Sequence, residues 1–403
     1  MNPTSASVDL RAIPKGSVLL HIGPPKTGTS ALQGACHEQR ALLASAGVHY
    51  AGPGVQPSTA AFAVTRREHP STGRPPSMRH WRSLVKEVAS HRNETVLISS
   101  EFFAGASAEQ AHEIVAALGG ERVHVVVTLR PLGKILASRW QQNVQEGARV
   151  GYGDWLADVL KAPESTHAKR FWSRQRHDAL VGRWSAAAST DRTHVVVIDD
   201  RDHDGILRTF EQLLGIPTET LTGHRDTPNR SMTLEEIEVV RAFNQQFADA
   251  GLAPSLRYQL MSRGAATHLK RRSPLKDEPR ITTPRWALDE ANRVAQEMIE
   301  SIHSLGVKVY GDTSLLLTEG GGAQQEDSAE SGTRVSVTPE IAARAAIGVL
   351  FASGATRGYE SGSKVPAWGE PYDLQRATTL QLLTVAAQRV ITSIARRLRR
   401  LIR

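Results

Sequence analysis

Residues 17–30, SVLLHIGPPKTGTS, join a short apolar run to a turn rich in glycine, proline and hydroxyl side chains, at the start of a helical pattern. A strand, a loop of this kind and a helix in succession bring backbone N–H groups, the ammonium of Lys26 and a helix N-terminus to one point. That combination attracts a phosphate or a sulfate. The alternative is an ordinary turn, with Ser30 as the helix cap and Lys26 in solvent, but such a turn requires neither the lysine nor the run of hydroxyls.

Around this loop, apolar runs alternate with helical patterns from residue 17 to residue 217, which predicts an α/β domain with a parallel sheet between two layers of helices. The expected strands are 17–22, 95–99, 123–129 and 194–199. The expected helices are about 29–46, 108–119, 131–146, 174–187 and 204–215. Further on, the periodicity predicts helices at 233–249, 284–305 and 338–353, and a short strand in VKVYG, 307–311.

The pattern breaks after residue 317. Residues 318–336, TEGGGAQQEDSAESGTRVS, contain too few apolar side chains to pack, which predicts a flexible linker between an α/β domain at 1–317 and a helical extension at 337–403. Residues 374–403 include a basic amphipathic pattern, LQLLTVAAQRVITSIARRLRRLIR. Such a helix suits an anionic membrane surface or an acidic partner, and packing on its own domain is the alternative.

Composition indicates a folded protein that works inside the cell. Of the 403 residues, 40% are hydrophobic, which is ample for a core. Cys36 is the single cysteine, so an intrachain disulfide and a cysteine metal cage are excluded. No apolar run has the length of a signal peptide or a membrane span, and the expected location is the cytoplasm, with peripheral membrane contact through the tail. The net charge of +8 owes much to the C-terminal arginines, and no nucleic-acid partner is expected.

The loop differs from the nucleotide-triphosphatase P-loop, G-x-x-x-x-G-K-[ST], because Lys26 precedes Gly28 instead of following it. HVVVIDD, 194–200, imitates the strand and acid that hold magnesium in that class. Without the Gly-Lys pair, Asp199 and Asp200 are expected to end a strand in a turn. No metal site is expected, since the histidines also lack ligand-like spacing.

Polar side chains follow three of the predicted strands: Lys26, Glu101 and Arg130. In open parallel sheets, ligands bind beyond the carboxyl ends of the strands, so one site is expected to contain all three. Arg130 precedes Pro131 at a predicted helix N-terminus, where the dipole disfavours a cation unless an anion binds there; a salt bridge to a carboxylate is the alternative. Glu101 is a candidate general base or a loop cap, and His21 is a competing base or a buried core histidine.

Two of these segments also resemble a known family. HIGPPKTGTSALQ, 21–33, resembles the 5′-phosphosulfate loop of the sulfotransferases that use 3′-phosphoadenosine 5′-phosphosulfate, and TLRPLGKILASRWQQNVQEG, 128–147, resembles their 3′-phosphate segment. A weaker likeness extends over roughly residues 16–317, in the manner of bacterial members. The resemblance implies a P-loop-like, three-layer α/β/α parallel sheet, here with a helical C-terminal extension. It also implies sulfuryl transfer, without a metal, to a hydroxyl or amine of a carbohydrate, a lipid or a small molecule.

The resemblance also assigns roles to residues. Lys26 would contact the bridging oxygen and the leaving phosphate, and Glu101 would be the base, so these two are the expected catalytic residues. The expected donor-binding residues are Gly23, Pro25, Lys26, Thr27, Gly28, Thr29, Ser30, Arg130 and Ser138. Two other functions remain open: a P-loop phosphotransferase or kinase that uses ATP, and a catalytically inactive protein that binds a nucleotide or a carbohydrate.

Three segments are candidates for acceptor contacts. Residues 52–82 form a proline-rich basic insertion that is either a lid or an irregular surface excursion. Residues 268–276, HLKRRSPLK, suit an anion or a solvated loop. An aromatic group is expected to serve the core more than a ligand; it consists of Tyr152, Trp155, Phe171 and Trp172.

Overall fold

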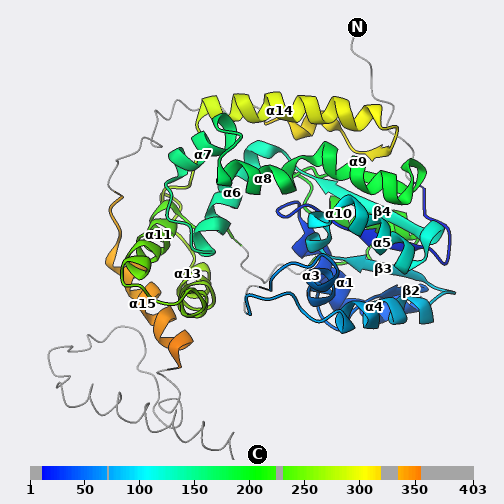
Figure 1. Ribbon diagram of the computed structural model, residues 1–403, viewed down its shortest axis with the longest axis horizontal. Coiled ribbons are helices and arrows are strands. Elements are labelled where there is room, and N and C mark those ends of the chain that lie inside the picture. Colours follow the sequence, from blue (N-terminus) through cyan, green and yellow to red (C-terminus); the bar gives the residue numbers. More distant parts are fainter. Residues whose placement is uncertain (1–10, 70–71, 224–229, 319–334, 355–403) are drawn as a thin grey trace, which may run out of the picture. The chain divides into compact units, whose positions relative to one another are not determined.

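The computed structural model describes residues 11–69, 72–223, 230–318 and 335–354. Within these residues, six strands form one parallel sheet in the order β2-β3-β1-β4-β5-β6 (Figure 1). The strands are β1 (Val18–His21), β2 (Val48–Tyr50), β3 (Thr95–Ser99), β4 (Val123–Leu129), β5 (Thr193–Val197) and β6 (Lys308–Tyr310). β1 lies in the middle of the sheet, because it pairs with β3 on one side and with β4 on the other.

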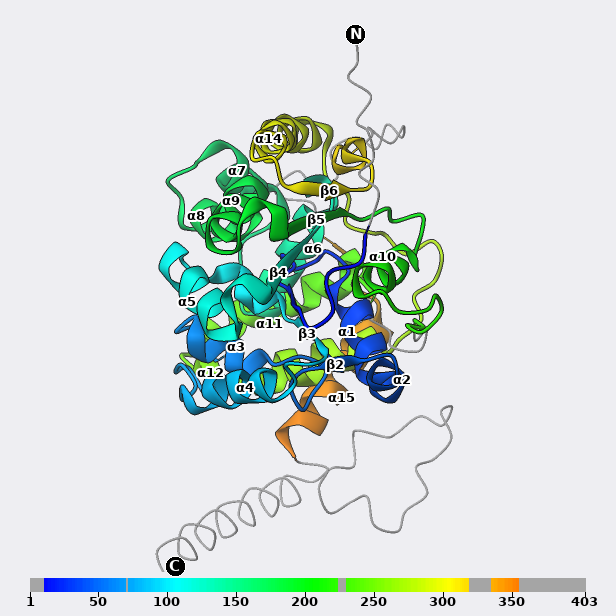
Figure 2. The ribbon, with the colours of Figure 1, turned by 90° about the vertical axis from the view of Figure 1, so that its right-hand side faces the viewer.

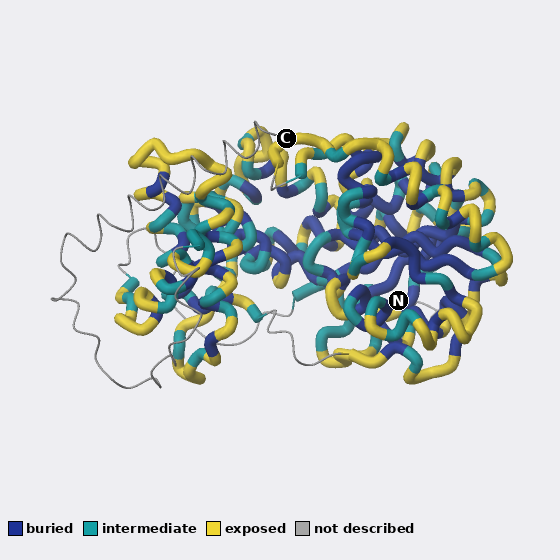
Figure 3. The backbone as a smooth tube through the Cα atoms, turned by 90° about the horizontal axis from the view of Figure 1, so that it is seen from below, coloured by how far each residue is buried: buried dark blue, intermediate teal, exposed yellow. Residues whose placement is uncertain are grey.

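Helices cover both faces of this sheet, because successive strand residues point to opposite sides. Leu20 and Ile98 face a core under α3 (Ser58–Val64), α4 (Arg79–Ser90), α5 (Ala108–Leu118) and α9 (His177–Ala188). Leu19 and Leu97 face a second core under α1 (Thr29–Glu38), α2 (Arg40–Ser45) and α10 (Gly205–Leu214). Figure 2 shows the two helical layers on either side of the sheet, and Figure 3 shows the strands as the buried centre. The predicted three-layer α/β/α parallel sheet is confirmed.

A third core lies among helices beyond the carboxyl end of β4. Trp140, Trp155, Phe171 and Ile237 are buried there together. The helices are α6 (Leu132–Gln145), α7 (Tyr152–Lys161), α8 (Thr166–Gln175), α11 (Leu234–Asp249), α12 (Pro254–Arg257), a π-helix (Tyr258–Ala265), α13 (Ala266–Lys270), α14 (Arg285–Ser304) and α15 (Pro339–Ser353). The aromatic group predicted at 152–172 therefore belongs to a core, as expected.

The expected helix at 338–353 is α15, and its Ile341 and Ala345 are buried in this third core, beside α11 and α13 (Figure 1). The extension thus begins as a packed helix. The linker predicted at 318–336 lies outside the described residues except at its ends, and the basic helix predicted within 374–403 lies wholly outside them.

The helices α4, α7 and α8 were not predicted, and the other differences from the sequence expectation concern short elements. The helix expected at 29–46 is divided at Gln39 into α1 and α2, and the short strand β2 was not predicted. Residues 52–82 contain α3, whose residues Ala60–Val64 are buried, so part of this insertion is packed, whereas its described residues from Arg66 to His80 are exposed or half-buried. None of the helices in the described ranges combines the length and the apolar character that crossing a bilayer demands.

Candidate functional site

The loop after β1 makes a tight turn that requires glycine. Gly23 has φ of 52°, and a Cβ placed on it would lie 2.7 Å from Cγ2 of Thr29 and 3.5 Å from Cβ of Glu101. Lys26 also has a positive φ, 78°, and Gly28, at φ 77°, leads into α1. The left-handed conformation is costly for a lysine, so the surrounding loop imposes it. Glu101 and the loop therefore approach each other closely enough to share one site.

The N-terminus of α1 opens onto the same place. The helix begins at Thr29 without a side-chain cap and has no acidic residue in its first turn. The positive end of its dipole is thus not neutralised by its own side chains. Thr29 is buried, whereas Gly28 and Ser30 are exposed and Pro25 is half-buried. An anion bound here would meet backbone N–H groups, as expected for a phosphate loop.

A chain of buried hydrogen bonds fixes the loop to the sheet. Thr27 Oγ1 donates to the carbonyl of Pro24 at 2.7 Å, so Thr128 must donate to Thr27, 2.8 Å away. His21 Nε2 then donates to Thr128 at 3.1 Å, and its Nδ1 accepts from Ser99 at 2.8 Å. This order assigns the neutral Nε2–H tautomer to His21.

His21 is therefore a core histidine and not a base. Its ring is fully buried, both of its nitrogens have partners, and burial lowers its pKa to about 3. The side chain of Thr27 is buried in the same chain of bonds and holds the loop in place, so only its backbone remains for a ligand.

Glu101 lies at the end of β3 and begins a 3₁₀ turn, Glu101–Gly105. Gln33 Nε2, from α1, donates to its Oε2 at 3.1 Å, and Gln56 Nε2 lies 3.5 Å from its Oε1. The carboxylate is half-buried. Two neutral amides thus orient it without a salt bridge that would occupy it, which suits a group that accepts a proton.

Lys26 extends toward α6, where its Nζ donates to Oε1 of Gln142 at 3.4 Å. Burial, together with the charges of Lys270 and Arg139, lowers the pKa of Lys26 to about 8, against the opposing effects of Glu146 and Glu101. The ammonium is therefore held where it lacks a close carboxylate, which leaves it available to an anion.

Arg130 lies on the other side of the loop, at the end of β4. Its Nη1 donates to the carbonyl of Lys26 at 3.4 Å, and its Nε lies 2.8 Å from Oδ1 of Asp200. The salt bridge that was the alternative for Arg130 is thus present. Lys134 Nζ contacts the same carboxylate at 2.7 Å, so two cations share one acid. Arg130 nevertheless lies beside the loop, one third exposed.

Ser138 stands on α6, eight residues after Arg130, and its hydroxyl donates within the helix to the carbonyl of Ile135 at 3.2 Å.

Asp199 and Asp200 follow β5 in a turn, as expected, and Asp199 pairs with Arg201. Neither acid is free of a cation. In the part of the chain that the structure describes, no group of three or more His, Cys, Asp or Glu is arranged to hold a metal ion.

The three strand ends that were expected to form one site come from neighbouring strands. β1 pairs with β3 through Val18–His21 and with β4 through the same residues, all in parallel. Lys26, Glu101 and Arg130 therefore leave the sheet at the same edge.

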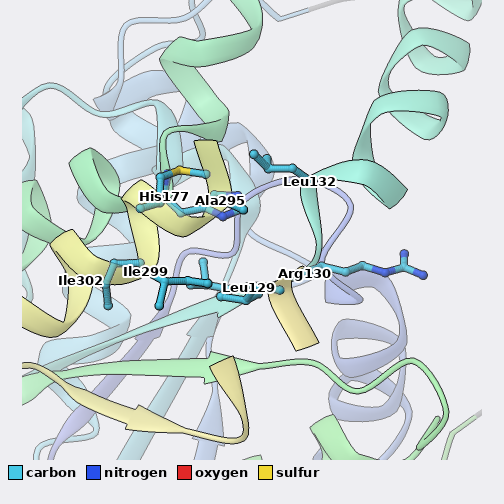
Figure 4. Close-up of a pocket in the computed structure, with 9 residues that line it drawn as sticks. Leu129, Arg130, Leu132, His177, Ala295, Ile299 and Ile302 are labelled. Carbon is cyan, nitrogen blue, oxygen red and sulfur yellow. The ribbon is translucent and has the colours of Figure 1, made fainter. Parts of the chain in front are cut away.

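A small apolar pocket beneath α14 is lined partly by Leu129, but the guanidinium of Arg130 points away from its wall and toward the loop side (Figure 4).

No local pattern pointed to Gln33, Gln56 and Gln142, which contact the two predicted catalytic residues. Gln33 lies four residues after Thr29, so its position on the buried side of α1 was predictable, although its partner was not.

Within 268–276, Arg272 is buried against Glu236 and Glu278, so this segment is not simply a solvated loop.

No family model matches the sequence, and no curated protein matches it. Among solved structures, the chain is similar to the sulfotransferase from Alicyclobacillus acidocaldarius, with 15% identity and a TM-score of 0.36. The likeness covers 60% of this chain and 94% of that chain. It is too distant to carry a conclusion about fold or chemistry, which rest on the sheet and the loop.

Proposed function

We propose that the chain is a sulfotransferase that moves a sulfuryl group from 3′-phosphoadenosine 5′-phosphosulfate to a hydroxyl or amine of a carbohydrate, a lipid or a small molecule. The observation that carries this proposal is the close approach of Glu101, at Gly23, to the loop that contains Lys26, where two adjacent parallel strands end. Among the described residues, Lys26 forms no ion pair with a carboxylate, and Glu101 is held by two amides and forms no ion pair with a cation.

The residues present suit the donor. Its 5′-phosphosulfate would lie over the uncapped N-terminus of α1, at Gly28, Thr29 and Ser30, with Gly23 and Pro25 shaping the loop. Lys26 would neutralise the charge that develops on the phosphate as the bond between sulfur and the bridging oxygen breaks. No step in this scheme requires a metal, and metal independence stays a prediction.

Arg130 and Ser138 are the proposed contacts of the 3′-phosphate. Arg130 would exchange Asp200 for the phosphate, and that exchange leaves no buried acid unpaired, because Lys134 remains 2.7 Å from Asp200. Ser138 would turn its hydroxyl away from the carbonyl of Ile135, a bond that costs little to break at a helix surface.

Glu101 is the proposed base. As the acceptor oxygen or nitrogen bonds to sulfur, its proton passes to the Glu101 carboxylate, while Gln33 and Gln56 hold that carboxylate in orientation. The phosphotransferase alternative is weakened because Asp199 and Asp200 are already paired with cations, which leaves no ready ligand for magnesium. A protein that binds the nucleotide without transfer remains the second alternative.

Two measurements test the proposal. Calorimetry in the presence of a chelator should detect binding of adenosine 3′,5′-bisphosphate and much weaker binding of ADP and AMP, which lack the 3′-phosphate. Glu101→Gln should keep the bisphosphate affinity and lower transfer by about 100-fold or more, the usual scale of a general base. Glu113→Gln, at an exposed position on α5, is the control and should change neither. Full transfer by Glu101→Gln would exclude Glu101 as the base, and equal binding of all three nucleotides would exclude the proposed donor.

A further inference from the structure

Four arginines gather beside the site from segments that are distant in the sequence. Two are on α8, one is on α6 and one follows α3; this arginine cluster consists of Arg67, Arg139, Arg170 and Arg174. The electrostatic effects that Arg139, Arg67 and Arg170 exert on Arg174 show that the four charges lie close to one another. Figure 1 shows α6, α7 and α8 in one region: α7 packs against both α6 and α8, and α8 also lies against the 3₁₀ turn that begins at Glu101.

Among the described residues, Glu146 is the carboxylate that forms ion pairs with this cluster. Glu146 Oε2 lies 3.0 Å from Nη2 of Arg170 and 3.9 Å from Nη2 of Arg139. Within the described part of the chain, Arg67 and Arg174 make no ion pair. Of the residues that the structure describes, Glu146 is therefore the ion-pair partner of the cluster, Glu101 adds a longer-range interaction with Arg67, and the cluster carries a marked excess of positive charge.

Arg139 is the most confined of the four. Its side chain is 6% exposed, yet Nη2 has no hydrogen-bond partner. Burial lowers the pKa of Arg139, and burial together with the neighbouring arginines lowers the pKa of Arg174 to about 9. A buried hydrogen-bond donor or charge is normally paired. Because the fold brings these four guanidiniums together, the cluster favours the binding of an anionic group.

The cluster is continuous with the proposed transfer centre. Lys26 donates to Gln142, and Gln142 Nε2 donates to Oε1 of Glu146 at 3.2 Å, one turn further along the same face. On the other side, the guanidinium of Arg67 lies 5.9 Å from the ring centre of Phe102, the residue after Glu101. Burial lowers the pKa of Arg67, and the charges of Glu146 and Glu101 oppose that shift, so the charges of Arg67 and Glu101 interact. The excess charge thus begins next to Lys26 and Glu101.

Arg130, a proposed 3′-phosphate contact, belongs with Asp200 and Lys134 to a separate group of ion pairs on the other side of the loop. The phosphates of the donor are accounted for by that group and by the α1 N-terminus. The arginine cluster adjoins the base and is left for the acceptor.

We propose that the acceptor is a molecule that carries an oxyanion group, such as a carboxylate, a sulfate or a phosphate, near the hydroxyl or amine that is modified, and that Arg67, Arg139 and Arg174 bind this group. Guanidiniums suit such groups because their planar donors match two oxygens at once. This inference rests on the proposed function and narrows its acceptor class. Glu146 acts in the opposite sense, since it repels the anion and competes for the arginines.

The test uses the full chain saturated with adenosine 3′,5′-bisphosphate. Calorimetry would compare three charged probes, glucuronate, glucose 6-sulfate and glucose 6-phosphate, with glucose, their neutral parent. At least one charged probe is expected to bind about tenfold or more tightly than glucose, and the strongest of the three identifies the oxyanion. Arg67→Gln and Arg174→Gln should each weaken that probe by about tenfold and leave the bisphosphate affinity within about twofold. Arg285→Gln, an exposed position on α14, is the matched control and should have no effect.

A variant with the opposite sign separates this role from a structural one. Glu146→Gln should tighten binding of the charged probe, because it removes the one competing carboxylate, whereas simple damage to the site would weaken it. Equal binding of all probes and glucose by a protein that still binds the bisphosphate would overturn the acceptor class and leave the proposed function intact. Loss of bisphosphate affinity in Arg67→Gln or Arg174→Gln would assign the cluster to the donor and overturn the inference. If the wild-type chain binds no bisphosphate, both proposals fail together.

Discussion

Binding of adenosine 3′,5′-bisphosphate at pH 8 is expected to draw a proton onto Lys26. Burial, with Lys270 and Arg139, lowers the pKa of Lys26 from its ordinary value of 10.5 to about 8. Roughly half of these side chains are therefore neutral at pH 8 in the free protein. Both phosphates of the nucleotide are already dianionic there, because their second pKa is about 6, so the nucleotide does not itself exchange a proton.

The size of the effect follows from this pKa. A phosphate beside the ammonium favours the charged form and raises the pKa of Lys26 back toward its ordinary value. Binding then takes up about half a proton per site at pH 8 and only about 0.1 at pH 7, where Lys26 is already almost fully charged. Because protonation accompanies binding, the nucleotide affinity should fall as the pH rises through about 8.

Calorimetry in two buffers with different ionisation enthalpies measures this uptake directly. Lys26→Gln removes the titrating group and should abolish the uptake at pH 8. Lys86→Gln, exposed on α4, is the control and should match the wild type. The assignment of Lys26 to the phosphate is refuted if Lys26→Gln and the wild type take up the same amount.

Three further predictions concern the loop, the 3′-phosphate contact and the tail. Gly23→Ala should destabilise the fold by about 1–2 kcal/mol or more, because of its positive φ and the contact with Thr29, with a lower Tm in thermal melts; Gly34→Ala, where a Cβ has open space, should not. Arg130→Ala should weaken the bisphosphate by about 10- to 100-fold and ADP hardly at all in calorimetry, and equal losses would contradict a 3′-phosphate role. Removal of residues 355–403 should preserve nucleotide binding and abolish cosedimentation with anionic vesicles at low salt, whereas a full chain that ignores such vesicles would exclude the membrane role of the tail.

Much of the sheet was predictable because its signals are local. The strands at 95–99 and 123–129 have the predicted bounds, since an apolar run flanked by turn residues depends only on its near neighbours. The same holds for the loop after β1, where glycines supply the positive φ values at positions 23 and 28. By contrast, α3 lies within a proline-rich segment whose composition resembles a loop, and β2 is only three residues long; burial against the core stabilises both.

The chemistry of the site depended on pairings that no local pattern contains. His21 is a neutral structural residue because Ser99 and Thr128, 78 and 107 residues away in the chain, take both of its nitrogens. Arg130 meets Asp200 because β4 and β5 are neighbours in the sheet.

The sequence by itself determined that Lys26, Glu101 and Arg130 follow strands of a parallel sheet, because strand and turn signals act over a few residues. Only the tertiary structure decided that these strands are adjacent, and that Arg67 and Arg174 form no ion pair with any described residue beside the same centre. Strand order and the approach of helices are set by the packing of the whole core, and the charge that surrounds a side chain is a property of that packing.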